Sequence, residues 1–208
     1  MKKVFFATMA ALFLAAQTLP VFASVDFVVS ANIPQASGVT ISLTKVMSND
    51  ILNRTVITNN QMSMDPMTFN MTNHIWLPDH YFVIDAGTTN GIGGLDLSMA
   101  YVEGDNQNLA TGGNGLGWKA CASFYKVVGT TETALTAHGN ATYAKRLLKT
   151  LISAPEHFLP ADTTGGFLRT YVGINSELAT TPTGAELFTT LDKGGAYSGT
   201  IKITASAV

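Results

Sequence analysis

The sequence predicts an all-β protein, a β-sandwich with one short helix. Short segments in which apolar and polar residues alternate recur along the chain, and such alternation is typical of strands with one buried face. Turn-forming residues separate these segments. The composition agrees, because 12% charged residues, 46% hydrophobic residues and 19 glycines are typical of an extracellular β protein. The length of 208 residues predicts a single domain.

The first 23 residues predict a secretory signal peptide. Lys2 and Lys3 precede an apolar segment at 4–16, and the stretch 21–23 provides a cleavage site. We therefore expect export and a mature chain that begins at Ser24. Removal of the two lysines takes the formal net charge from −2 to −4. No nucleic-acid partner is expected, because such a partner would need a basic patch.

Residues 24–34, at the start of the mature chain, predict one strand with an apolar face. Asp26, Ser30 and Asn32 lie on the opposite face, and Pro34 ends the run. The apolar face carries Val25, Phe27, Val29, Ala31 and Ile33. Two interpretations are open: a first strand paired within its own sheet, or a strand donated to a neighbouring copy.

The two ends of the mature chain resemble one protein family. Residues 27–33 are similar to the N-terminal donor strand of major subunits of alternate chaperone–usher fimbriae, the colonisation-factor-antigen type. They depart from that pattern at Val28, which takes a polar position. The run 195–204, Gly-Ala-Tyr-Ser-Gly-Thr-Ile-Lys-Ile-Thr, resembles the opening of the last strand of such a subunit. Residues 48–192 lie outside the resemblance.

The resemblance implies an incomplete immunoglobulin-like β-sandwich that is completed by donor strand exchange, a form of strand addition at a sheet edge. The expected organisation is a signal peptide at 1–23, a donor strand at 24–34 and a pilin domain at 35–208. The five apolar residues of the donor strand would fill pockets of the next copy. The acceptor groove and chaperone contact would be formed by Tyr197, Ile201, Ile203, Ala205, Ala207 and Val208.

The function that the resemblance implies is that of a structural fimbrial subunit, not an enzyme, which is exported through the periplasm to a fimbrium on the cell surface. The implied partners are identical subunits, a periplasmic chaperone and an outer-membrane usher, with a host receptor as a further candidate and no cofactor. Two alternatives stay open. One is a minor or tip pilin that binds a receptor, and the other is a free secreted β-sandwich binding protein or hydrolase.

The middle of the chain predicts further elements. Alternation predicts strands at 39–44, 55–58, 81–84, 95–101, 118–128, 167–174 and 186–191, before the last strand at 197–208. Apolar spacing predicts a basic amphipathic helix at 143–152, which either caps the open end of the sandwich or contacts a membrane or partner. The loop at 103–117 is a candidate for variable outer surface or receptor contact. Met62, Met64, Met67 and Met71 are interpreted as core filler rather than a sulfur-rich binding box.

No residue pattern in the chain predicts catalysis. His74 and His80, with Asp79 and Asp85, form a weak metal-site candidate, because histidines of this kind are common in exposed loops. The glycine-rich run 112–117 lacks the lysine of a phosphate-binding loop. The single cysteine, Cys121, excludes an internal disulfide and is expected to be a small buried side chain.

Overall fold

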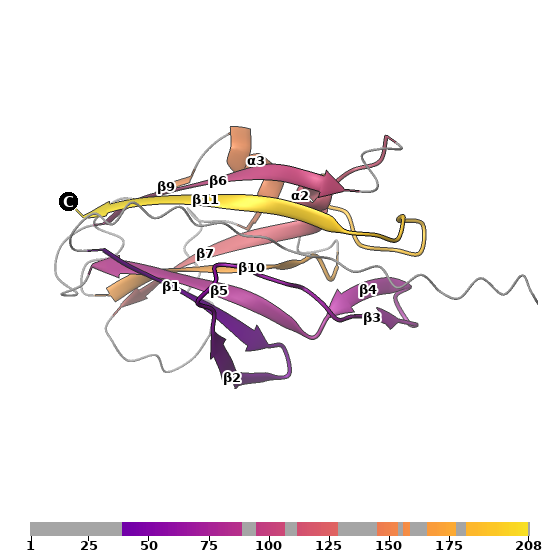
Figure 1. Ribbon diagram of the computed structural model, residues 1–208, viewed down its shortest axis with the longest axis horizontal. Coiled ribbons are helices and arrows are strands. Elements are labelled where there is room, and N and C mark those ends of the chain that lie inside the picture. The colour runs from indigo at the N-terminus through magenta and orange to yellow at the C-terminus, as the bar shows by residue number, and fades with distance from the viewer. Residues whose placement is uncertain are drawn as a thin grey trace, which may run out of the picture.

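The structure, a computed structural model, describes residues 39–88, 95–106, 112–128, 145–153, 156–158, 166–177 and 182–207. Most of these residues form β-strands and the helices are short, which confirms the all-β prediction (Figure 1). None of the helices in the described part is long and apolar enough to cross a membrane. The predicted signal peptide, the predicted donor strand with its five apolar residues, and Val208 lie outside the described residues.

The larger sheet is antiparallel throughout and forms the lower layer of Figure 1. The register aligns Leu43, Ile84 and Thr170 in a row across three strands, and all three side chains are buried. In spatial order, the strands are β2 (Asp50–Val56), β1 (Val39–Met47), β5 (His80–Thr88), β10 (Gly166–Ile174), β7 (Ala120–Val128) and β8 (Arg146–Leu147).

The smaller sheet forms the upper layer of Figure 1 and consists of β11 (Tyr197–Ala207), β6 (Leu95–Asn106) and β9 (Glu156–Phe158). It is also antiparallel. Ile201 lies opposite Tyr101 and Ile203 lies opposite Met99, and these four side chains are buried. The alternation that predicted both long strands therefore separates their buried face from the face with polar residues.

Three short elements complete the described fold. The hairpin of β3 (Met67–Asn70) and β4 (Ile75–Pro78) lies at one end of the molecule. Helix α2 (Leu116–Lys119) leads directly into β7, and helix α3 (Leu148–Ser153) packs against β6. The sequence analysis did not identify β3, β4 or α2, because four residues give too short a pattern to recognise.

The hydrophobic core lies between the two sheets and takes side chains from both. Phe82 and Ile84 come from the larger sheet, and Met99 and Ile203 come from the smaller one. The core-filler interpretation of the methionines is confirmed for Met62 and Met64, which are fully buried, while Met67 packs on the core from its margin. It is wrong for Met71, whose side chain is 76% exposed.

One predicted element in the middle of the chain is shorter than expected, and another is wrong. The helix expected at 143–152 starts only at Leu148, because Leu147 pairs with Cys121 as part of the larger sheet. The strand expected at 186–191 is irregular, and only Thr189 forms a bridge, with Ile75. Here the Asp192 carboxylate accepts a hydrogen bond from the Thr189 backbone at 2.7 Å, which favours a turn over a strand.

The predicted loop at 103–117 is also shorter than expected. Its first four residues continue β6 to Asn106, and Leu116 and Gly117 begin α2. The strand expected at 55–58 instead occupies Asp50–Val56, and it pairs with β1 through a tight turn. The other predicted strands correspond to β1, β5, β6, β7, β10 and β11.

Candidate functional site

The last strand of the described chain, β11, has one open edge. It pairs with β6 from Tyr197 to Ala207, and no other strand among the described residues pairs with its second edge. Backbone donors and acceptors on an open edge form a template for another strand. Within the described residues, this edge of β11 is therefore a candidate site for an additional extended segment.

Four of the six predicted acceptor residues share the inner face of β11. Tyr197, Ile201, Ile203 and Ala205 are at most 3% exposed, whereas Lys202 and Thr204 between them are exposed. Ala207 belongs to the same strand, but its side chain is not described. The structure brings the four residues together, as the period-2 pattern predicted.

An apolar cavity lies beside this face, between β1 of the larger sheet and β11 of the smaller sheet. Its volume is about 150 Å³. Most of its wall is aliphatic, and it includes Ile41, Leu43, Ile57, Ile84 and Ile203. Because β1 packs against β11, the strand at the edge of the smaller sheet, the cavity lies near the edge of β11 that has no described partner. We call the cavity and the open edge together the groove.

Sequence reasoning found only one wall of the groove. Ile203 was predicted, but Ile41, Leu43, Ile57 and Ile84 were not. Ile41 and Leu43 were recognised as apolar residues of one strand. Their position opposite β11 depends on the stacking of the two sheets, which the strand pattern does not specify.

Close contacts of the run 195–199 hold the beginning of strand β11 in place. The Tyr197 hydroxyl donates to the Lys193 carbonyl at 2.7 Å, and the Ser198 hydroxyl donates to the Asp105 carbonyl at 3.0 Å. Gly199 lies directly on the Tyr101 ring, so that a β-carbon at this position would overlap the Tyr101 hydroxyl. The Gly-x-Tyr-Ser-Gly sequence is thus explained by local packing in this chain.

Glu103 holds Tyr101 in place from the other side. One carboxylate oxygen accepts from the Tyr101 hydroxyl at 3.0 Å and from the Leu116 backbone at 2.8 Å. The other oxygen accepts from the Gly117 backbone at 3.0 Å. Burial is the main cause that raises the pKa of Tyr101, and the charge and hydrogen bond of Glu103 add to it. The phenol therefore stays protonated and donates to the carboxylate.

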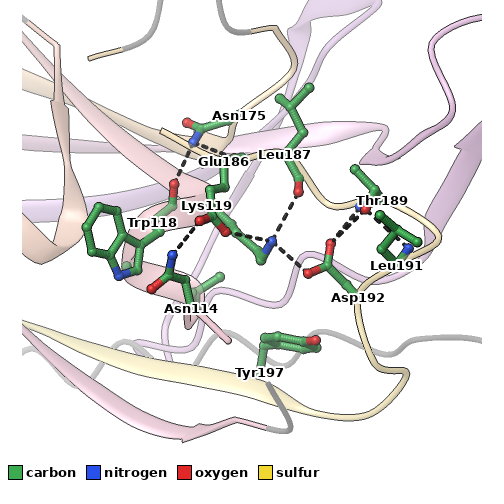
Figure 2. A network of polar contacts seen from close by, with 12 residues as sticks. Asn114, Trp118, Lys119, Asn175, Glu186, Leu187, Thr189, Leu191, Asp192 and Tyr197 are labelled. Carbon is green, nitrogen blue, oxygen red and sulfur yellow. Dashed lines mark hydrogen bonds and ion pairs between the residues drawn. The ribbon is translucent and has the colours of Figure 1, made fainter. Parts of the chain in front are cut away.

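A buried lysine organises the end of the molecule near the start of β11, as Figure 2 shows. The Lys119 side chain is 3% exposed, and its Nζ lies 2.8 Å from Asp192 Oδ1 and 3.3 Å from Glu186 Oε2. It also donates to the Leu187 carbonyl at 3.1 Å. A buried ammonium group needs such partners, because an unpaired charge in the interior is strongly unfavourable.

Hydrogen bonds from the side chain of Asn175 and the backbone of Glu186 connect this network to the larger sheet. The Asn175 amide donates to the Trp118 carbonyl at 3.0 Å and to the Glu186 carbonyl at 2.9 Å, as drawn in Figure 2. The Glu186 backbone donates to the Trp118 carbonyl at 2.9 Å. The irregular segment 182–196 is thereby fixed to α2 and β10 without forming a strand. Sequence analysis missed this network, because Lys119 appeared only as part of a predicted strand.

The weak metal candidate does not form a site. His80 is buried, with its two ring nitrogens 2.6 Å from Asp79 Oδ1 and 2.7 Å from the Ser63 carbonyl. Asp85 instead forms a bidentate ion pair with Arg169, with two distances of 2.7 Å. Within the described ranges, no three histidine, cysteine, aspartate or glutamate side chains gather as metal ligands.

The prediction for Cys121 is confirmed. Its side chain is buried, at 4% exposure, on β7. Burial raises the pKa of this thiol to about 11, so the side chain behaves as a small apolar residue at neutral pH.

Comparison with known proteins identifies no relative: no family model, no curated protein and no solved structure matches the chain.

Proposed function

We propose that this chain is a structural subunit of a surface fimbrium of the alternate chaperone–usher class and that it polymerises by donor strand exchange. The observation that supports this most directly is the groove, in which an edge of β11 without a partner among the described strands lies beside an aliphatic cavity. In the proposed fibre, residues 24–34 of one copy enter the groove of the next. The immunoglobulin-like sandwich of each subunit is then completed by its neighbour.

The chemistry of the two partners is complementary. The groove presents Ile41, Leu43, Ile57 and Ile203, and the donor segment presents an apolar side chain at every second position. An added strand would bond to the open edge of β11 while its alternate side chains turn toward the cavity. Burial of Phe27, Val29 and Ile33 contributes roughly 5–9 kcal/mol before backbone hydrogen bonds and ordering costs.

A contact of this kind produces a fibre. The donor segment and the groove are different surfaces, so the contact is heterologous and can repeat without closing. A periplasmic chaperone would cover the groove before assembly, and an outer-membrane usher would exchange the chaperone for the next subunit. Export by way of the predicted signal peptide is consistent with both partners.

The test supplies the missing strand in cis. Residues 35–208 would be compared with the same segment followed by a flexible linker and residues 24–34. The matched control carries Val29→Asp and Ile33→Asp in the added segment. We expect the added strand to raise the thermal unfolding midpoint and the control to leave it unchanged, because a charge in the cavity has no partner.

Two results would contradict the proposal. One is a stable monomer of residues 35–208 that gains nothing from the added strand. The other is full-length mature protein that stays a monomer in native size measurement and forms no denaturation-sensitive ladder on a gel. Either result would favour a free secreted binding protein with residues 25–33 paired internally.

A further inference from the structure

A second hollow, which shares no lining residue with the cavity of the groove, lies between the β3–β4 hairpin and the start of β11. Its volume is about 150 Å³. Its aromatic lining consists of Trp76, which is partly exposed, and of Phe188 and Tyr197, which are at most 2% exposed, and Thr190 and Asp192 contribute polar groups. We call it the aromatic pocket. Its entrance segment, 189–194, is the turn that replaced the predicted strand.

We propose that the aromatic pocket binds one neutral pyranose ring of a glycan. The partly exposed Trp76 ring can attract the C–H face of a sugar ring, and a few fixed polar groups set the orientation of the sugar. This binding belongs to the single subunit. It does not depend on strand exchange, and the two proposals can fail separately.

The charge balance of the pocket favours a neutral ligand. The lining carries one acidic and one basic residue, Asp192 and Lys193, and Asp192 Oδ1 lies 2.8 Å from the buried Lys119 ammonium (Figure 2). Its Oδ2 accepts from the Thr189 backbone at 2.7 Å. The Lys119 ammonium therefore offsets the charge of the Asp192 carboxylate. The carboxylate can still accept hydrogen bonds from sugar hydroxyl groups, but it attracts a free cation only weakly.

The pocket is also held in shape before any ligand arrives. Phe188 and Tyr197 pack edge to face with ring centroids 5.0 Å apart, and the Trp76 backbone donates to the Phe188 carbonyl at 2.8 Å. The Tyr197 hydroxyl donates to the Lys193 carbonyl, which fixes the far side of the turn. A preformed site loses little conformational entropy on binding, so a small ligand can bind measurably.

The experiment is saturation-transfer difference NMR on the purified mature protein. The probes are methyl β-galactopyranoside, methyl β-glucopyranoside and methyl N-acetyl-β-glucosaminide. We expect transfer to the ring protons of at least one probe, with a dissociation constant of roughly 1 mM. Trp76→Ala and Thr190→Val should each weaken binding by at least tenfold. Leu191→Ala is the matched control, because this side chain is 93% exposed on the same turn and does not line the pocket.

A second measurement covers the case in which Trp76→Ala does not fold. The chain has two tryptophans, so Trp118→Phe leaves Trp76 as the only tryptophan whose fluorescence is followed. A saturable change in its emission with the same pyranoside supports the proposal. The proposal is overturned if no neutral pyranoside gives saturation transfer, if Thr190→Val binds as well as Leu191→Ala, or if acetate or tetramethylammonium binds more tightly than every neutral probe.

Discussion

Replacement of Gly199 by alanine tests the packing that positions β11. A β-carbon at Gly199 would overlap the Tyr101 hydroxyl and lie 2.5 Å from Cζ of the same ring. The Tyr101 ring cannot easily move away, because Glu103 accepts a hydrogen bond from its hydroxyl and Gly117 packs closely against it. A β-carbon at Gly117 would lie only 2.8 Å from Cε1 of the ring. Overpacking a rigid core costs about 1–3 kcal/mol, and this geometry places Gly199→Ala at the upper end, near 3 kcal/mol.

This loss is large enough to measure on the mature protein. In a domain of this size, each kcal/mol lowers the unfolding midpoint by about 2–4 °C, so we expect a decrease of about 6–12 °C. Gly173→Ala in β10 is the matched control, because its nearest neighbour would be Tyr81 Cβ at 3.5 Å, an ordinary contact. The control should keep its stability or gain up to about 1 kcal/mol.

A double mutant identifies the cause. Tyr101→Leu shortens the side chain and removes the atoms that alanine would meet. Gly199→Ala should therefore cost close to nothing in the Tyr101→Leu background, and urea unfolding of the four proteins measures the coupling. An equal cost of Gly199→Ala in both backgrounds would refute the packing argument.

Three further predictions follow from the buried polar groups. Asp192→Asn should lower the free energy of unfolding, measured in urea, by about 3 kcal/mol, because buried Lys119 loses its nearest partner. Glu186→Gln should cost less than about 1 kcal/mol, because the Glu186 side chain is 38% exposed. The reverse order of the two costs would contradict the assignment. Burial raises the pKa of Tyr197 from 10.0 to about 12, and the charge of Asp192 makes a smaller contribution. The stability linked to the protonated phenol is therefore fully present below pH 10 and is lost as the pH rises toward 12. Tyr197→Phe should flatten the loss of stability over that range in urea unfolding, and an unchanged profile would count against it. Because burial raises the Cys121 pKa from 9.0 to about 11, its thiolate fraction at pH 8 is roughly a hundredfold lower than that of a thiol with a pKa of 9.0. A thiol reagent should therefore modify Cys121 quickly only when urea unfolds the protein. Rapid labelling of the folded protein would contradict the burial of Cys121.

Sequence reasoning worked best where one strand has one buried face. β6 and β11 alternate over most of their length, and β1 alternates over 39–43, before Val46 is buried out of phase. Buried residues such as Leu43, Met99 and Ile203 are those that the pattern places on the apolar face. A period of two residues is a property of the extended backbone itself, so it is visible without knowledge of the neighbours.

The remaining features depend on partners that are distant in the sequence. Leu147 fits the helical spacing, but its pairing with Cys121 draws it into the sheet. Lys119 resembles an exposed residue until Asp192 and Glu186 are placed beside it. The groove was predicted on its β11 side, whereas its β1 wall follows from how the two sheets stack. Long-range packing decided each of these cases, and local propensity did not.

The pairing of β6 with β11 has a consequence for the order in which the chain acquires structure. Tyr101 lies opposite Ile201, and the other residues of β6 likewise pair with residues of β11 that lie about one hundred positions later in the chain. Contacts of such long sequence separation form slowly. During synthesis, the apolar side chains of β6 emerge well before the strand that shields them. A chaperone that covers this surface until β11 has been synthesised would protect the nascent chain from aggregation, whether or not the folded protein joins a fibre.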